Sequence, residues 1–176
     1  MTQNLLTRST TRNTDHSGFT LIELAVVTLL IALFAGLTLP LLSGGEHRAL
    51  RSTSRRISGM TRWCYNEAAL SGLEHRLVFD LQRQVFFAQR LESDGELVVL
   101  SGPGRERIPA GQARIKDVTI IGRGKFSSQT ATVRILPAGW LEETVLHLEA
   151  GDEAELTLRL MPLTGTSETY DGYREF

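Results

Sequence analysis

The chain has 176 residues, 19 basic and 20 acidic side chains, and a formal net charge of -1. This length allows one ordinary domain, or a small domain behind an anchor, and the balanced charge selects neither nucleic acid nor an acidic partner. The single cysteine, Cys64, excludes an internal disulfide and a thiolate metal framework.

The N-terminal part of the chain divides into a polar stretch and an apolar one. Residues 1–18 are rich in Thr, Ser and Asn without apolar periodicity, which indicates an unstructured leader. Residues 19–42 contain one charged side chain, that of Glu23. As a helix this stretch reaches about 36 Å, enough to cross a hydrocarbon core about 30 Å thick. A cleaved secretory signal is the alternative, but its apolar region is only about 7 to 15 residues long. We therefore predict a transmembrane helix over residues 19–42.

A second, amphipathic helix is predicted over residues 43–72, after a break at Ser43, Gly44 and Gly45. Its apolar side carries Leu50, Ile57, Met60, Cys64 and Ala68. Its opposite side is a candidate basic contact face, formed by Arg48, Arg51, Arg55 and Arg62. Lipid headgroups, acidic subunit faces and DNA are candidate partners of this face. Charged helix faces are usually solvated or face a subunit, so nucleic acid is not the expected partner.

Residues 73–163 carry short β-rich runs separated by turn residues, which predicts a β domain. Strands are expected at 77–81, 85–91, 97–100, 114–121, 130–136, 144–148 and 155–161. The Gly- and Pro-containing stretch 101–113 is expected to be a mobile loop, and residues 164–176 a flexible tail. The fold class is therefore α+β, with a long N-terminal helix packed on an antiparallel sheet.

The run Gly18-Phe19-Thr20-Leu21-Ile22-Glu23 resembles the prepilin motif shared by type IV pilins and type II secretion pseudopilins. This resemblance implies leader cleavage between Gly18 and Phe19 and methylation of the new Phe19 amine. It also implies that Glu23 acts in assembly, by neutralising the amine of a neighbouring subunit. Physical chemistry singles out Glu23 as well, because a carboxylate within an apolar segment is costly and normally has a partner. Pro40 lies where many pilin-like proteins carry a proline that weakens the helix, so a kink is expected there.

Residues 66–91 are similar to the end of the helix and the first hairpin of H-type minor pseudopilins. The matching positions are Asn66, Glu67, Ala68, Ser71, Gly72 and Asp80. The chain lacks the acidic calcium loop of the major, G-type pseudopilin, and it is short for the K-type tip subunit. The resemblance thus implies a minor pseudopilin that assembles near the tip of the pseudopilus. A type IV pilus minor pilin, with a role in DNA uptake, is the alternative.

The same resemblance implies partners and a location. Expected partners are other major and minor pseudopilins, the prepilin peptidase and methyltransferase, the inner-membrane secretion platform and secreted substrates. The arginines after the apolar segment outnumber Arg8 and Arg12 before it, so a positive-inside count would place the β domain in the cytoplasm. Processing of the motif requires the leader in the cytoplasm. We therefore expect a single-pass inner-membrane protein with a periplasmic β domain.

The remaining chemically capable residues do not predict an enzyme, a cofactor or a metal site. Cys64 is expected to be a small core residue. His47, His75 and His147 are scattered singly along the chain. An acidic set is expected to form a solvated face, because it lacks the spacing of a calcium loop, and it comprises Glu142, Glu143, Glu149, Asp152, Glu153 and Glu155. Gly122, Gly124 and Lys125 are interpreted as a turn, because they lack phosphate-loop spacing.

Overall fold

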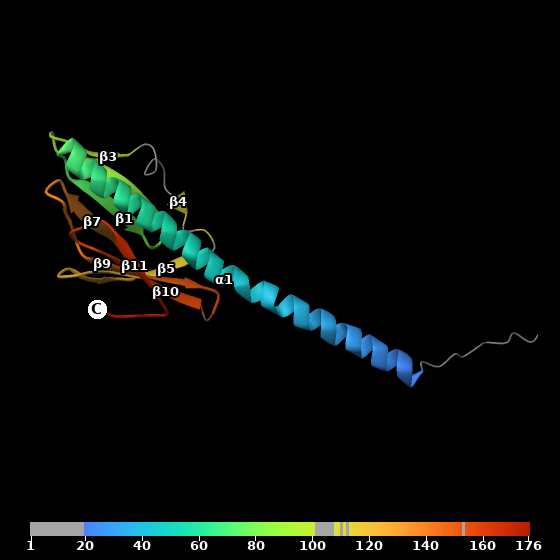
Figure 1. Cartoon of the computed structure of the whole chain (residues 1–176). Coiled ribbons are helices and arrows are strands. Elements are labelled where there is room, and N and C mark those ends of the chain that lie inside the picture. The colour runs from blue at the N-terminus through green and yellow to red at the C-terminus, as the bar shows by residue number, and fades with distance from the viewer. Residues whose placement is uncertain (1–19, 101–107, 110, 112, 153) are drawn as a thin grey trace, which may run out of the picture. The chain divides into compact units, whose positions relative to one another are not determined.

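The computed structural model describes residues 20–100, 108–109, 111, 113–152 and 154–176 (Figure 1). The chain divides into two compact units, residues 1–41 and 42–176. A single helix, α1 (Leu21–Ser71), contributes to both. The predicted break at Ser43, Gly44 and Gly45 is therefore wrong, because a glycine inside a helix costs only about 1 kcal/mol relative to alanine. The kink at Pro40 stays a prediction, since that side chain lies outside the described ones.

Two antiparallel sheets build the second unit (Figure 1). The first has the order β3-β2-β1-β7-β8, and β4 also pairs with β2. Its strands are β1 (His75–Asp80), β2 (Val85–Leu91), β3 (Leu97–Val99), β4 (Ile108–Pro109), β7 (Thr130–Leu136) and β8 (Trp140–Leu141). The second has the order β11-β10-β9-β5-β6. Its strands are β5 (Arg114–Ile120), β6 (Gly124–Phe126), β9 (Thr144–Ala150), β10 (Ala154–Leu160) and β11 (Ser167–Asp171).

The core of the second unit lies between its helical residues and the two sheets. The predicted apolar side of the helix is confirmed, since Leu50, Ile57, Met60, Cys64 and Ala68 are each at most 2% exposed. They belong to one hydrophobic cluster with inward residues of both sheets. In β1, for example, Leu77 pairs with Ala88 of β2 and with Val133 of β7, and all three side chains are buried. The α+β class predicted from the sequence is thus the observed one.

The C-terminal residues differ from the flexible tail predicted for 164–176. Residues 167–171 form β11, which pairs with β10 in the register Leu158↔Thr169. Beyond the strand, the Gly172 N–H donates to the Glu155 carbonyl and the Arg174 N–H donates to the Thr157 hydroxyl. Glycines and polar residues suggested mobility, but these long-range backbone bonds cannot be read from local composition.

The stretch around Gly122 and Gly124 is only partly the predicted turn. Gly122 has a positive φ of 83° and lies in the turn after β5. Gly124 and Lys125 already belong to β6, which pairs with β5 through Thr119↔Lys125. Residues 121–123 therefore form the turn of a hairpin at the edge of the sheet. Gly124 and Lys125 begin its second strand.

Candidate functional site

The N-terminal end of α1 is closed by a reciprocal pair of residues, Thr20 and Glu23. The Glu23 carboxylate accepts hydrogen bonds from the Thr20 backbone N–H at 2.9 Å and from the Thr20 hydroxyl at 3.0 Å. The Glu23 backbone N–H donates to the Thr20 hydroxyl at 3.3 Å. This arrangement is a capping box, which satisfies N–H groups that the first helical turn leaves without partners.

Thr20 is the residue at this end that the sequence reasoning missed. Its signal was present, because threonine followed three residues later by glutamate, before an apolar run, is the capping-box pattern. Glu23 is nevertheless exposed, beside a hollow of about 310 Å³ lined by Ile22, Val26 and Val27. Its carboxylate is therefore satisfied within the single chain and also accessible to a second one.

The expected cleavage, methylation and membrane insertion concern the N-terminal segment, which the structure describes only in part. Gly18 and Phe19, the expected cleavage and methylation residues, lie outside the described part, as does the leader before them. Within the described residues, no helix combines the length and the hydropathy of a membrane span.

The predicted basic face of α1 is exposed. Arg48, Arg51, Arg55 and Arg62 all present their side chains to solvent in the second unit. Two adjoining hollows, of about 340 and 580 Å³, run beside this face and share Arg51, Arg55 and Asp171 in their linings. Because Asp171 belongs to β11, this groove lies between the helix and an edge strand. The sequence identified the arginines but not the groove, which depends on a strand more than 100 residues away.

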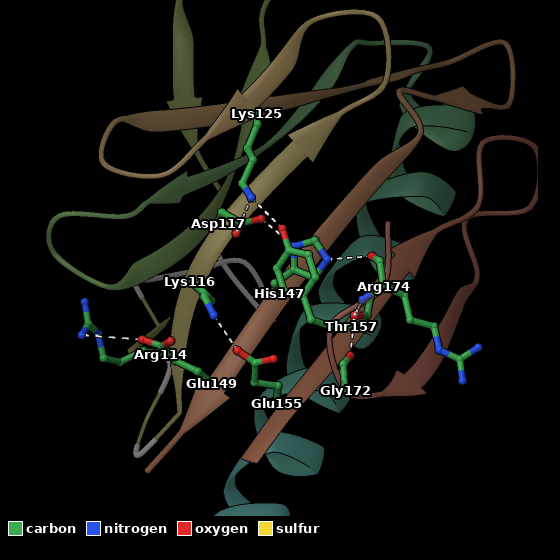
Figure 2. Close-up of polar contacts among 11 residues, drawn as sticks. Arg114, Lys116, Asp117, Lys125, His147, Glu149, Glu155, Thr157, Gly172 and Arg174 are labelled. Atoms are coloured by element: carbon green, nitrogen blue, oxygen red, sulfur yellow. Dashed lines mark hydrogen bonds and ion pairs between the residues drawn. The ribbon is translucent and has the colours of Figure 1, made fainter. Parts of the chain in front are cut away.

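A second polar cluster surrounds His147, which is not solitary as the sequence suggested (Figure 2). Its Nδ1 lies 2.5 Å from Oδ1 of Asp117, and its Nε2 lies 2.8 Å from the Arg174 carbonyl oxygen. The ring also stacks on Tyr173, with centroids 3.7 Å apart. Lys125 reaches the same place, with Nζ 3.1 Å from Oδ2 of Asp117. Both ring nitrogens are engaged by protein oxygens, so the cluster fastens the C-terminal residues to the sheet and leaves no free ligand position.

The acidic set does not form the uniformly solvated face that was predicted. Glu142 is 5% exposed, and its Oε2 lies 3.0 Å from the Arg123 guanidinium and accepts the Arg134 backbone N–H at 2.8 Å. Burying a carboxylate requires such partners, because an unpaired charge loses its hydration. Glu143, Glu149 and Glu155 each pair with a basic side chain instead, namely Arg159, Arg114 and Lys116. Most carboxylates of the acidic set are thus neutralised by basic side chains of the same chain.

Cys64 is buried, as expected for a core thiol. Burial among apolar neighbours, together with the nearby Glu67 charge, raises the pKa of the thiol to about 12. A thiol with this pKa carries almost no thiolate near neutral pH, so Cys64 is a poor nucleophile. No group of three or more His, Cys, Asp or Glu residues suited to a metal ion occurs in the described part of the chain.

Comparisons with known proteins bear on both the N-terminal segment and the fold. Residues 13–39 match the prokaryotic N-terminal methylation motif. A crystal structure of the minor pseudopilin EpsH from the type II secretion system of Vibrio cholerae has a TM-score of 0.57 at 12% sequence identity, covering 73% of this chain and 98% of that one. A second EpsH structure gives 0.56 at 12% identity, covering 69% and 94%. No curated protein matches this chain in sequence.

The motif and the fold agree with each other. The motif implies processing by a prepilin peptidase, assembly with other pilins and inner-membrane anchoring through the N-terminal helix. The second unit, with its helix packed on antiparallel sheets, has the architecture of EpsH. The chain is thus a pilin-like protein that combines the prokaryotic N-terminal methylation motif with the α+β fold of a minor pseudopilin.

Proposed function

We propose that the chain is a minor pseudopilin of a type II secretion system, which assembles near the tip of the pseudopilus and supports export of folded proteins across the outer membrane. The observation that carries this proposal is the conjunction of the methylation motif at residues 13–39 with an EpsH-like fold at 12% identity. The motif by itself is equally typical of type IV pilins. The likeness to EpsH, a secretion subunit, is the reason to favour a secretion role over a pilus role.

The proposed mechanism is assembly rather than catalysis. Hydrolysis of the Gly18–Phe19 peptide bond removes the leader and frees the Phe19 amine, which is then methylated. The processed subunit is held in the inner membrane by residues 19–42, with its β domain in the periplasm. Its proposed partners there are other pseudopilins and the secretion platform, which adds the subunit to the growing filament.

Glu23 provides the driving force for assembly in this proposal. A carboxylate in an apolar medium is costly without a partner, and the positive amine of a neighbouring subunit would neutralise it. In the single chain, Thr20 supplies only hydrogen bonds to the same carboxylate. The amine of a neighbouring subunit, whether it replaces Thr20 or binds beside it, therefore stabilises the assembled state relative to the free subunit.

Replacing Glu23 by glutamine tests the charge separately from the cap. Glutamine also serves at the third position of a capping box, so Glu23→Gln preserves the helix end and removes the negative charge. We expect this variant to insert in the membrane in normal amounts, but to lower the secretion of a type II substrate at least tenfold. Immunoblots of membrane fractions and of culture medium measure the two quantities.

Thr20→Val is the matched control, because it removes the capping hydroxyl and keeps the Glu23 charge. We expect secretion by this variant to stay within about twofold of the unmodified chain, since a lost cap costs only about 1 kcal/mol. Normal secretion by Glu23→Gln would falsify the assembly role. A strain that lacks this chain provides a second test. If that strain secretes normally but has lost pilus formation or DNA uptake, the chain is a type IV pilus minor pilin instead.

A further inference from the structure

Ion pairing is distributed unevenly among the basic residues that the structure describes. Away from α1, eight lysines and arginines form ion pairs with carboxylates, and they are Arg76, Arg90, Arg114, Lys116, Arg123, Lys125, Arg134 and Arg159. The side chains of Arg48, Arg51 and Arg55 of α1 form no ion pair or hydrogen bond with any residue that the structure describes. Most basic side chains described on the two sheets are thus neutralised within the chain, whereas Arg48, Arg51 and Arg55 of the helix remain available.

The spacing of the three arginines makes their lack of partners informative. They follow one another at intervals of three and four residues, so their guanidinium groups share one side of the helix. Like charges at these intervals repel each other, and the helix would be more stable with an acidic residue among them. Glu46 lies on the same helix, but its carboxylate packs against Gly151 in the turn between β9 and β10. The arginine row is therefore suited to an anionic group from outside the chain.

The row borders a recess rather than an open surface. The groove defined above by its two hollows has Ser54, Leu156 and Thr169 in its lining, with Arg51 and Arg55 along one side. His47 and Arg48 extend it along the helix. Among the residues that the structure describes, Asp171 is the one acidic residue in the lining of either hollow. The groove thus combines a basic wall with one carboxylate and some apolar surface.

The opposite wall of the groove is the outermost strand of a sheet. β11 stands last in the order β11-β10-β9-β5-β6, so one of its edges has no neighbouring strand in the described structure. Ser167, at the start of β11, holds the strand to the helix through a 2.5 Å contact between its hydroxyl and that of Ser58. Thr169 and Asp171 follow at two-residue intervals, so they share the face of β11 that Ser167 turns toward α1. A strand added at this edge would direct alternate side chains to the same face.

We propose that this groove binds an extended, acidic polypeptide segment of a partner protein. The segment pairs with the free edge of β11, in the manner of strand addition, and places alternate carboxylates against Arg51 and Arg55. The spacings agree, because residues four apart on a helix are separated by about 6 Å along its axis, and alternate residues of a strand by about 6.8 Å. This inference is independent of Glu23, which lies in the other unit.

Asp171 distinguishes a peptide from a nucleic acid or a lipid headgroup. Phosphate groups following the arginine row would approach this carboxylate and be repelled by it. A peptide can instead place a basic or hydrogen-bonding side chain opposite Asp171. Strand pairing further requires backbone N–H and C=O groups, which a phosphate ester does not provide.

The test uses the full chain in dodecyl maltoside micelles and a fluorescein-labelled probe. The probe is a capped octapeptide in which Glu alternates with Thr, except that Lys replaces the terminal Glu that would face Asp171, and its binding is measured by fluorescence anisotropy. We expect saturable binding that weakens as salt increases, because the contacts are between charges. The variant Arg48→Gln/Arg51→Gln/Arg55→Gln should weaken binding at least tenfold.

Three controls separate the proposed mode from general charge attraction. The variant Arg56→Gln/Arg62→Gln/Arg83→Gln also loses three positive charges, none of them in the groove lining, and should bind within twofold of the unmodified chain. A probe with Gln in place of Glu should bind at least tenfold more weakly. A probe N-methylated at alternate residues keeps its charges but loses half of its backbone donors, and should bind several-fold more weakly.

Each of several outcomes would overturn the proposal. Equal binding of the Glu and Gln probes would show that the arginines do not select an acidic segment. Equal effects of the two triple variants would show that the groove is not the site. Preferential binding of a duplex oligonucleotide, or of phosphatidylglycerol added to the micelles, would assign the arginine row to a phosphate ligand instead.

Discussion

His75 and His147 are both almost fully buried, but their surroundings differ. His147 is held between the Asp117 carboxylate and the Arg174 carbonyl, with both ring nitrogens engaged. The His75 ring contacts the Leu73 carbonyl oxygen through Nδ1, at 3.0 Å. Burial lowers the pKa of His75, and the facing Arg90 charge lowers it further, while the Leu73 carbonyl and Glu67 act in the opposite direction. The folded protein therefore favours a neutral His75.

The lowered pKa of His75 predicts a loss of stability in mild acid. Below the ordinary histidine pKa of about 6.5, the unfolded chain binds a proton that folded His75 resists, so the free energy of unfolding falls as pH falls. In His75→Asn, the amide can still donate to the Leu73 carbonyl and has no such titration. We expect the unmodified chain to lose more stability than His75→Asn between about pH 7.5 and pH 5.5. Urea unfolding followed by tryptophan fluorescence measures both, and parallel pH profiles would contradict the prediction.

Residues whose role depends on local sequence could be predicted, and those with distant partners could not. Gly18, Phe19 and Glu23 stand out because the motif is contiguous and lies beside an apolar run. Glu142 was misinterpreted as solvated because its partner Arg123 is brought near by the sheet arrangement, 19 residues away in sequence. The same holds for His147 and Asp117, which are 30 residues apart. Their pairing requires the β5–β9 register, which no local pattern specifies.

Among the elements, the second half of α1 is tied to both sheets by one side chain, Tyr65. Its hydroxyl lies 2.7 Å from the Gly139 carbonyl, in the turn before β8, and 2.6 Å from the Leu163 carbonyl, in the turn before β11. The ring itself packs against Gly165, where an added Cβ would lie 2.4 Å from Cγ of Tyr65. The absence of a side chain at residue 165 thus allows the turn to approach the helix.

Gly165→Ala should therefore destabilise the second unit more than another glycine with a positive φ. Alanine at 165 meets the Tyr65 ring and must also adopt a φ of 62°. Overpacking costs about 1–3 kcal/mol, in addition to about 1–2 kcal/mol for a left-handed alanine. Gly122→Ala is the matched control, because its φ is 83° and its Cβ would have no neighbour within 4 Å. Thermal unfolding should show the larger decrease in Tm for Gly165→Ala, and equal decreases would exclude the steric role of Tyr65.

Predictability also differed among the elements. The strands at 85–91 and 130–136 were predicted with the bounds that are observed, because each is flanked by turn residues and rich in β-branched or aromatic side chains. β11 was missed, since its sequence Ser-Glu-Thr-Tyr-Asp lacks an apolar alternation. This edge strand is stabilised by its pairing with β10, which cannot be predicted from the amino-acid composition of β11 alone.

At the scale of the whole molecule, the hydrophobic core belongs to one of the two units. Every member of the core cluster lies between residues 50 and 160, within the unit of residues 42–176. Exposed large apolar residues are concentrated in the described start of α1, for example Leu21, Leu29 and Phe34. Among the described residues, the first unit therefore exposes its large apolar side chains, and only the second unit buries an extensive apolar core.

This distribution predicts that a chain of residues 43–176 folds without the N-terminal unit. Its core is complete, so we expect cooperative unfolding, as is usual for single domains of this size. Cys64 offers a direct readout, because its burial and its pKa of about 12 both prevent reaction in the folded state. At mildly alkaline pH, a thiol reagent should label Cys64 in concentrated urea and leave it unmodified in buffer.

Phe79→Ala in the same shortened chain provides the comparison with a damaged core. Phe79 is fully buried in the cluster that also contains Cys64, and its truncation costs about 3–5 kcal/mol. Labelling of Cys64 in buffer should therefore become measurable in this variant, because local or global opening is more frequent. If the shortened chain without this substitution reacts as fast in buffer as in urea, the core depends on residues before 43. Slow labelling that is accelerated by Phe79→Ala would instead show that packing within the second unit is sufficient to exclude the reagent.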